Sequence, residues 1–240
     1  MKIEILEDSI LINKEILVFS DIHLGYENSY VGLYPKIQLK EIKDKINRIF
    51  DNLNNNIKIK KIIILGDIKN NFSSVTADEW RETVNFFNFL NDKIKNKENI
   101  IVIKGNHDIF IEPVLKKIGI KLVESLILDN MLFIHGDKHI KIDNKIKYLF
   151  LGHLHPIISL KDAYKIEKFR CFLKGIWNRK QVFILPSFSF LNNGYDIRNI
   201  KDEETEFLMI AKKFLLDFEV IIFNEKEDKT YNFGKIKKIK

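Results

Sequence analysis

Two histidines separated by one residue, His153 and His155, are the first candidates for chemistry in this chain. They follow the apolar run Tyr148–Leu151, which predicts a short buried strand that ends at Gly152. Pro156 has no backbone N–H and is expected to prevent further strand pairing. In a loop after a strand, both imidazoles can face one point, and neutral imidazole binds Zn, Mn, Fe or Co. The motif indicates a metal site but does not establish one alone.

Candidate metal ligands also follow predicted apolar strands at four other places. They are Asp21 with His23; Asp67; Asn106 with His107 and Asp108; and His135. Five of the six histidines therefore lie at strand ends, where ligands gather in open α/β sheets. Oxygen and imidazole donors without thiolate favour a divalent ion. The donors are too many for one ion but fit two ions that share a carboxylate, an arrangement used for in-line displacement at phosphorus.

The elements that carry these loops alternate between strand and helix. A hairpin is expected at the N-terminus, over 1–12. Single strands are then expected at 15–20, 61–65, 100–103, 131–134 and 148–151. Helices are expected from Pro35 to Leu53, from a capping box at Thr76 and Glu79 to Ile94, and over 114–118. Later the pattern predicts strands 169–174 and 181–185, a helix over 206–216, and a hairpin of 219–223 with 229–233.

Composition excludes several classes of protein. The chain has 240 residues, 45% of them hydrophobic, which is enough to bury the core of one α/β domain. No apolar run approaches the ~20 residues of a membrane span, and residues 1–7 are too acidic for a signal peptide, so we expect a cytoplasmic protein with no membrane association. The single cysteine, Cys171, excludes an internal disulfide and is expected to pack as a small hydrophobe.

The five loops together resemble the signature of the calcineurin-like metallophosphoesterases. Their order is Asp-x-His at 21–23, Gly-Asp at 66–67, Gly-Asn-His-Asp at 105–108, His-Gly at 135–136 and Gly-His-x-His at 152–155. The resemblance implies an α/β fold, a four-layer α-β-β-α sandwich formed by a single domain over 1–240. The metal-site motifs would lie in 21–155, and 156–240 would complete the sheets.

The chain further resembles the archaeal phosphoesterases related to SbcD and Mre11, a group that includes the DNA-ligase-associated type. The similar stretches are 21–27 followed by Pro35, 66–69, and 185–188 with Gly194. Asn70 departs from this group, in which a histidine is common at that position. Full nucleases of the Mre11 type carry a capping domain and a helical segment that binds an ATPase coiled coil. Too little chain follows His155 for both, so no Rad50-type ATPase partner is expected.

The resemblance also implies roles for the site residues. The first ion would be held by Asp21, His23 and His155, and the second by Asn106, His135 and His153, with Asp67 bridging the two. His107 would be a non-ligand that protonates the leaving oxygen or stabilises charge, and Asp108 would fix its ring. A hydroxide bridging the ions would be the nucleophile. Manganese is the expected metal, with Zn, Fe, Ni and Co as alternatives.

These observations predict a dinuclear-metal phosphodiesterase or nuclease that acts on single-stranded or flapped DNA. The net charge of +7 is compatible with a nucleic-acid substrate, although a solvated lysine-rich surface explains it equally well. One alternative is a phosphomonoesterase or nucleotide phosphodiesterase of the same fold. Another is a non-catalytic metal-stabilised scaffold, such as the retromer subunit that shares the fold; the presence of His107 and of every ligand favours an enzyme. The oligomeric state is left open, a homodimer included.

Overall fold

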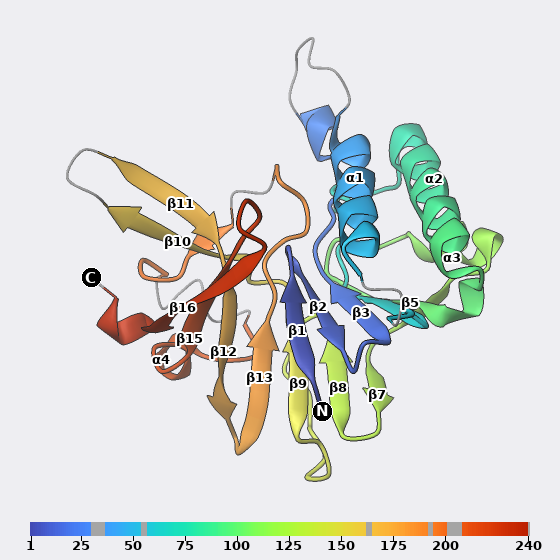
Figure 1. The fold of residues 1–240 in the computed structure, drawn as a ribbon. Coiled ribbons are helices and arrows are strands. Elements are labelled where there is room, and N and C mark those ends of the chain that lie inside the picture. Colours follow the sequence, from blue (N-terminus) through green and yellow to red (C-terminus); the bar gives the residue numbers. More distant parts are fainter. Residues whose placement is uncertain (30–36, 54–56, 162–164, 192–193, 201–207, 240) are drawn as a thin grey trace.

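Two β-sheets packed face to face form the centre of the molecule, and helices cover the outer face of one of them (Figure 1). This computed structural model describes residues 1–29, 37–53, 57–161, 165–191, 194–200 and 208–239. The first sheet has the order β1-β2-β3-β4-β5-β6. Its strands are Ile3–Leu6, Ser9–Ile12, Ile16–Phe19, Lys61–Ile64, Ile100–Ile103 and Lys121–Val123.

The second sheet has the order β16-β15-β12-β13-β9-β8-β7. Its strands are, in the same order, Lys229–Lys235, Glu219–Asn224, Phe172–Trp177, Lys180–Ile184, Tyr148–Leu151, Met131–Ile134 and Leu126–Leu128. A small third sheet, β11-β10-β14, is formed by Ile166–Arg170, Pro156–Lys161 and Tyr195–Asp196. Strands β3 to β6 run parallel, as do β8, β9 and β13, so their carboxyl ends meet at one edge of each sheet.

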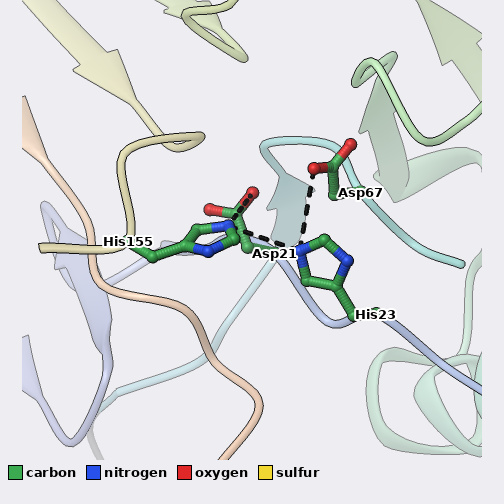
Figure 2. Close-up of side chains that lie close together, drawn as sticks. All are labelled: Asp21, His23, Asp67 and His155. Atoms are coloured by element: carbon green, nitrogen blue, oxygen red, sulfur yellow. Dashed lines mark hydrogen bonds and ion pairs between the residues drawn. The ribbon is translucent and has the colours of Figure 1, made fainter. Parts of the chain in front are cut away.

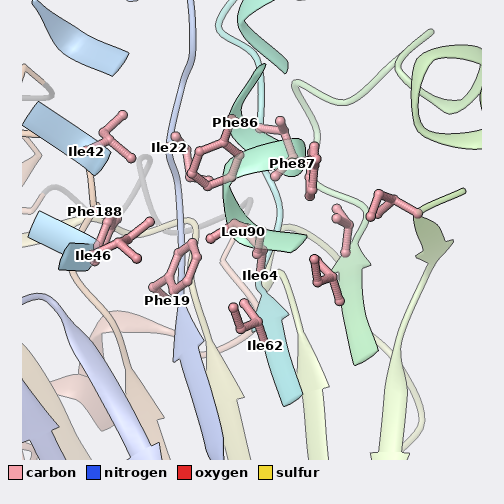
Figure 3. Close-up of a cluster of buried hydrophobic side chains, with 14 of the residues drawn as sticks. Phe19, Ile22, Ile42, Ile46, Ile62, Ile64, Phe86, Phe87, Leu90 and Phe188 are labelled. Carbon is pink, nitrogen blue, oxygen red and sulfur yellow. The ribbon is translucent and has the colours of Figure 1, made fainter. Parts of the chain in front are cut away.

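Three helices pack on the first sheet: α1 (Gln38–Asp51), α2 (Ala77–Ile94) and α3 (Glu112–Ile118). Figure 3 shows Phe86, Phe87 and Leu90 of α2 above Phe19 and Ile64 of the sheet. The predicted capping box at the start of α2 is confirmed. The predicted start of α1 at Pro35 lies outside the described residues. Short 3₁₀ helices occupy Tyr26–Ser29, Lys97–Asn99 and Ile236–Lys238.

The fourth layer, on the outer face of the second sheet, is mostly irregular. It contains the short helix α4 (Lys212–Leu215), so the prediction of a helix over 206–216 was too long. Residues 206–207 lie outside the described part, and Met209 donates its backbone N–H to the Gly136 carbonyl instead of to a helical partner. Ala211 has an extended backbone, with ψ 148°. Met209 is therefore bonded to the loop after β8 instead of within a helix, and α4 begins only at Lys212.

Two strand predictions near the metal-site loops were wrong. The stretch 169–174 is not one strand, because Cys171 divides it between β11 of the third sheet and β12 of the second. The chain changes sheets there, and Cys171 donates its N–H to the Pro156 carbonyl at 3.0 Å. Pro156 does not end pairing: it begins β10, a first-residue position where its missing N–H is tolerated. Cys171 is fully buried, as expected.

The described elements confirm the expected sandwich. No helix in the described ranges is long and apolar enough to cross a membrane. Between the sheets, Phe150 stacks on Phe133 and Phe183 from the neighbouring strands, with ring centroids 4.9 and 5.3 Å apart. These rings pack with Ile63 and Ile101 of the first sheet. The sheets are thus joined by an aromatic ladder directly beneath the loops that follow β8 and β9.

Replacing Phe150 with alanine should lower the free energy of unfolding by about 3–5 kcal/mol, since it removes the central ring of this ladder and leaves a cavity. Urea denaturation measures the effect. Ile176→Ala is the matched control: Ile176 is 76% exposed, and its truncation should change stability by less than about 0.5 kcal/mol. Equal denaturation midpoints for the two variants would contradict this account of the core.

Candidate metal centre

Five loops meet at the carboxyl ends of β3, β4, β5, β8 and β9, and they carry the candidate metal ligands that the sequence predicted there. Backbone hydrogen bonds join neighbouring loops. The N–H of Ile22 donates to the Asp67 carbonyl at 3.0 Å, and the N–H of Gly152 donates to the His135 carbonyl at 2.9 Å. The N–H of His153 donates to an Asp21 carboxylate oxygen at 3.1 Å and so connects the two sheets. Backbone N–H groups therefore fix the five loops to one another, with the Asp21 carboxylate as one of the acceptors.

The first ligand group consists of Asp21, His23, Asp67 and His155 (Figure 2). His155 Nε2 lies 3.1 Å from Asp21 Oδ1 and 3.3 Å from His23 Nε2. His23 Nε2 lies 3.7 Å from Asp67 Oδ2. All four side chains are buried. The donor atoms of this group lie within 4.8 Å of one another, as ligands of a single ion require.

The second ligand group consists of Asp67, His135 and His153, and Asn106 adjoins it. His135 Nε2 lies 3.0 Å from Asn106 Oδ1, 3.2 Å from His153 Nδ1 and 3.4 Å from Asp67 Oδ2. The other ring nitrogen, Nδ1, donates to the Leu65 carbonyl at 2.6 Å. That bond places a proton on Nδ1, so Nε2 is the atom that would bind a metal ion when the ring is neutral. All seven predicted metal residues are thus brought together.

Five of the seven candidate ligand residues adopt unusual backbone conformations. Positive φ angles occur at Asp21 (56°), His23 (50°), Asp67 (53°), His153 (65°) and His155 (45°). Residues other than glycine seldom adopt this left-handed region, and such strain clusters at functional sites. The conformation turns side chains that follow a strand toward a common point. It therefore helps to explain the convergence of the residues from three of the five loops, those after β3, β4 and β9.

The chemistry of the donors fits a divalent ion of hard or borderline character. Carboxylate and amide oxygens and imidazole nitrogens make up both groups. Burial, with the neighbouring His155, lowers the pKa of His23 to about 3, and burial with His135 lowers the pKa of His153 to about 4. Neutral imidazole is the form that binds metal. Burial also disfavours a charged His135, but the carboxylates of Asp67 and Asp21 raise its pKa to about 10.

His107 and Asp108 lie in the same loop, but their relationship differs from the prediction. His107 Nδ1 lies 2.6 Å from the Asn70 carbonyl, and this contact orients the ring. The buried Asp108 carboxylate instead accepts backbone N–H groups of Asp67, Ile68 and Gly105 at 2.8–2.9 Å. Asp108 joins the loops after β4 and β5, so the expectation that it fixes the ring of His107 was wrong.

Several supporting residues escaped prediction. Ser20 donates to Asp21 Oδ2, and Ser187 donates to the Asp21 carbonyl at 2.7 Å. Gln38 of α1 donates to the His23 carbonyl at 2.8 Å. A polar residue at the end of an apolar strand was a usable signal for Ser20. Ser187 follows the predicted strand 181–185 and lies in the similar stretch 185–188, but its contact with Asp21 was not predicted. Gln38 lies within the expected first helix and carried no such signal.

Comparisons with known proteins identify the family. The sequence matches the calcineurin-like phosphoesterase family over residues 14–222. The structure is similar to nuclease MPE of Pseudomonas putida, with TM-score 0.62, 17% identity, and 92% of this chain and 91% of that chain covered. The comparisons also found a single-mutant Vps29 of Entamoeba histolytica, with TM-score 0.36, 13% identity, and 91% of this chain and 98% of that chain covered. They found a predicted phosphoesterase of Streptococcus pneumoniae as well, with TM-score 0.37, 13% identity, and 92% of this chain and 97% of that chain covered. No curated protein matches the sequence.

The buried Asp/His cluster and the fold define a metal-dependent phosphoester hydrolase. The chain belongs to the calcineurin-like phosphoesterase family, since the match extends over most of its length.

Gly152→Ala should reduce the metal content of the protein. A Cβ at position 152 would overlap the Ser20 hydroxyl and lie 2.8 Å from Asp21 Oδ2, so the ligand carboxylate would be displaced. Metal analysis of the purified protein measures the loss. Adding Ser20→Ala removes the overlapped hydroxyl and should restore part of the metal. Full metal content in Gly152→Ala would show that the close packing at this glycine does not matter.

Proposed function

We propose that this protein is a dinuclear-metal phosphodiesterase that cleaves single-stranded or flapped DNA. The observation that carries the proposal is the position of Asp67, whose carboxylate belongs to both ligand groups. One shared carboxylate between two clusters suits two ions ~3.5–4 Å apart, the spacing used for in-line displacement at phosphorus. The set Asp21, His23 and His155 would hold one ion, and Asn106, His135 and His153 the other.

Manganese is the metal we propose, because mixed oxygen and imidazole donors suit it. When bound, the two ions supply Lewis-acid activation of water and of the phosphoryl group. The protein holds the ligand side chains in place through its backbone: Ser187 and Gln38 donate to the carbonyls of Asp21 and His23. The ligands are therefore preorganised, which limits the reorganisation needed when substrate binds.

We assign His107 to proton transfer or charge stabilisation at the leaving oxygen. A carbonyl can only accept, so the contact with Asn70 places a proton on Nδ1 and leaves Nε2 as the atom that gains or loses one. His107 Nε2 lies 3.9 Å from Asp67 Oδ2, and the His107 ring makes an edge contact with His23, with centroids 4.6 Å apart. The side chain thus adjoins both ligand groups and belongs to neither.

Support for a DNA substrate comes from charge and from a structural relative. The net charge of +7 favours polyanions, and the Pseudomonas putida relative is named a nuclease. The relation to the SbcD/Mre11 group, the cytoplasmic location, the absence of a Rad50-type partner and the oligomeric state stay predictions.

The proposal is tested by a rate screen with Mn²⁺ against single-stranded DNA, flapped DNA, a generic phosphodiester and a phosphomonoester. We expect cleavage of the DNA substrates and the diester above the monoester. His107→Asn should lower the diester rate about 10²–10⁴-fold while the protein keeps its metal and its melting temperature. Normal turnover in this variant would exclude the assigned role, and an inactive wild-type protein with full metal would favour a scaffold.

Asp67→Asn should reduce metal content more than His23→Ala does. Asp67 contributes to both ligand groups, whereas His23 contributes to one. We expect the Asp67 variant to lose both ions and the His23 variant to keep the second. Metal-to-protein ratios from elemental analysis decide the point. Equal ratios in the two variants would argue against a bridging carboxylate.

A further inference from the structure

Two exposed aromatic side chains lie on the loops that hold His107. Phe72 is 53% exposed and belongs to the loop after β4, which also provides the Asn70 carbonyl. Phe110 is 64% exposed and follows His107 in the loop after β5, with φ 68°. A bulky residue in the left-handed region is unfavourable, and such strain clusters at functional sites. Each of these two loops therefore carries one exposed aromatic side chain.

Phe72 packs directly on the ring of His107. Their ring centroids are 3.6 Å apart and the planes are inclined by 34°, so one face of Phe72 covers the imidazole. Phe72 is absent from the hydrophobic core clusters formed by the described residues. One face of the phenyl ring therefore contacts the site and the opposite face is open to solvent.

The position of Phe72 is fixed by its loop. The backbone N–H of Asn71 donates to Glu79 Oε1 at 2.8 Å, and Lys69 Nζ donates to the Asn71 carbonyl. Ser73 donates its backbone N–H to Asn71 Oδ1 at 2.9 Å, which closes a turn around Phe72. Glu79 and Lys69 are buried. The exposed ring is thus carried by an anchored turn, as a rigid binding surface requires.

We propose that the open face of Phe72 stacks a nucleobase next to the scissile phosphate, an inference that rests on the proposed phosphodiesterase function. A phosphate beside His107 is joined through its sugar to a base, and that base is within reach of the aromatic ring that covers the same imidazole. Stacking on an aromatic side chain accepts any base, because every base has a π face. Phe72 would therefore select nucleic acid over other phosphodiesters without reading sequence.

The test compares two single-stranded substrates with the same phosphodiester backbone, an oligothymidylate and an oligomer of abasic tetrahydrofuran residues, using Mn²⁺ and the full chain. The wild-type protein should have the higher kcat/KM on the base-bearing strand. Phe72→Ala should lower that preference about 5- to 100-fold, mainly through KM, and Phe72→Trp should preserve it. Phe214→Ala is the matched control: Phe214 lies on α4, on the outer layer, and is 44% exposed. It should keep the wild-type preference.

Two results for Phe72→Ala and two for the wild-type protein would overturn the inference. Equal losses on both strands, expressed in kcat, would mean that Phe72 acts only by positioning His107. An unchanged preference in Phe72→Ala would mean that the ring contacts no base. A wild-type protein that cleaves both strands equally would leave the proposed function intact and remove only this inference, whereas hydrolysis of bis(p-nitrophenyl) phosphate without cleavage of either strand would remove the DNA assignment as well.

Discussion

The buried carboxylate of Asp67 is the constraint on which the site depends. It lies at the end of β4 and is 1% exposed, so water cannot solvate it, and an unpartnered carboxylate there would cost several kcal/mol. Its partners come from other loops. The backbone N–H of His107 donates to Asp67 Oδ1 at 2.9 Å, and the ring nitrogen Nε2 of His135 lies 3.4 Å from Asp67 Oδ2. The absence of a side chain at Gly105 makes room for this carboxylate, because a Cβ there would overlap Asp67 Oδ1. One buried charge therefore dictates the approach of several loops.

Convergence on this carboxylate requires backbone strain, which the fold offsets with main-chain hydrogen bonds. A left-handed conformation costs roughly 1–2 kcal/mol for a residue other than glycine, and five ligand residues adopt it. Asp21, which is one of them, donates its N–H to the Gly66 carbonyl at 3.1 Å, and Ser187 donates to its carbonyl at 2.7 Å. The parallel strands beneath supply the rigidity. Ligand geometry is thus a property of the whole sheet edge.

The convergence of the site was predictable, because buried strands read as apolar runs and the first polar residues after them mark the strand ends. Features decided by tertiary pairing were not. Cys171 lies inside the predicted strand 169–174, yet the chain changes sheets there, and its N–H donates to the Pro156 carbonyl. The segment 208–210 has helical composition but attaches to Gly136. The carboxylate of Asp108 satisfies backbone N–H groups that have no sequence signature.

Asn70, which departs from the SbcD/Mre11-related group that the sequence resembles, illustrates how a ring can be oriented without a dedicated side chain. The main-chain carbonyl of Asn70 accepts from His107, and any residue type supplies such a carbonyl. The orientation of the imidazole therefore depends on the path of the loop. That path is set by Glu79, whose carboxylate accepts from Asn71 N–H at 2.8 Å and from Thr76 N–H at 2.9 Å. Glu79, which completes the capping box of α2, thereby also determines where the His107 ring points.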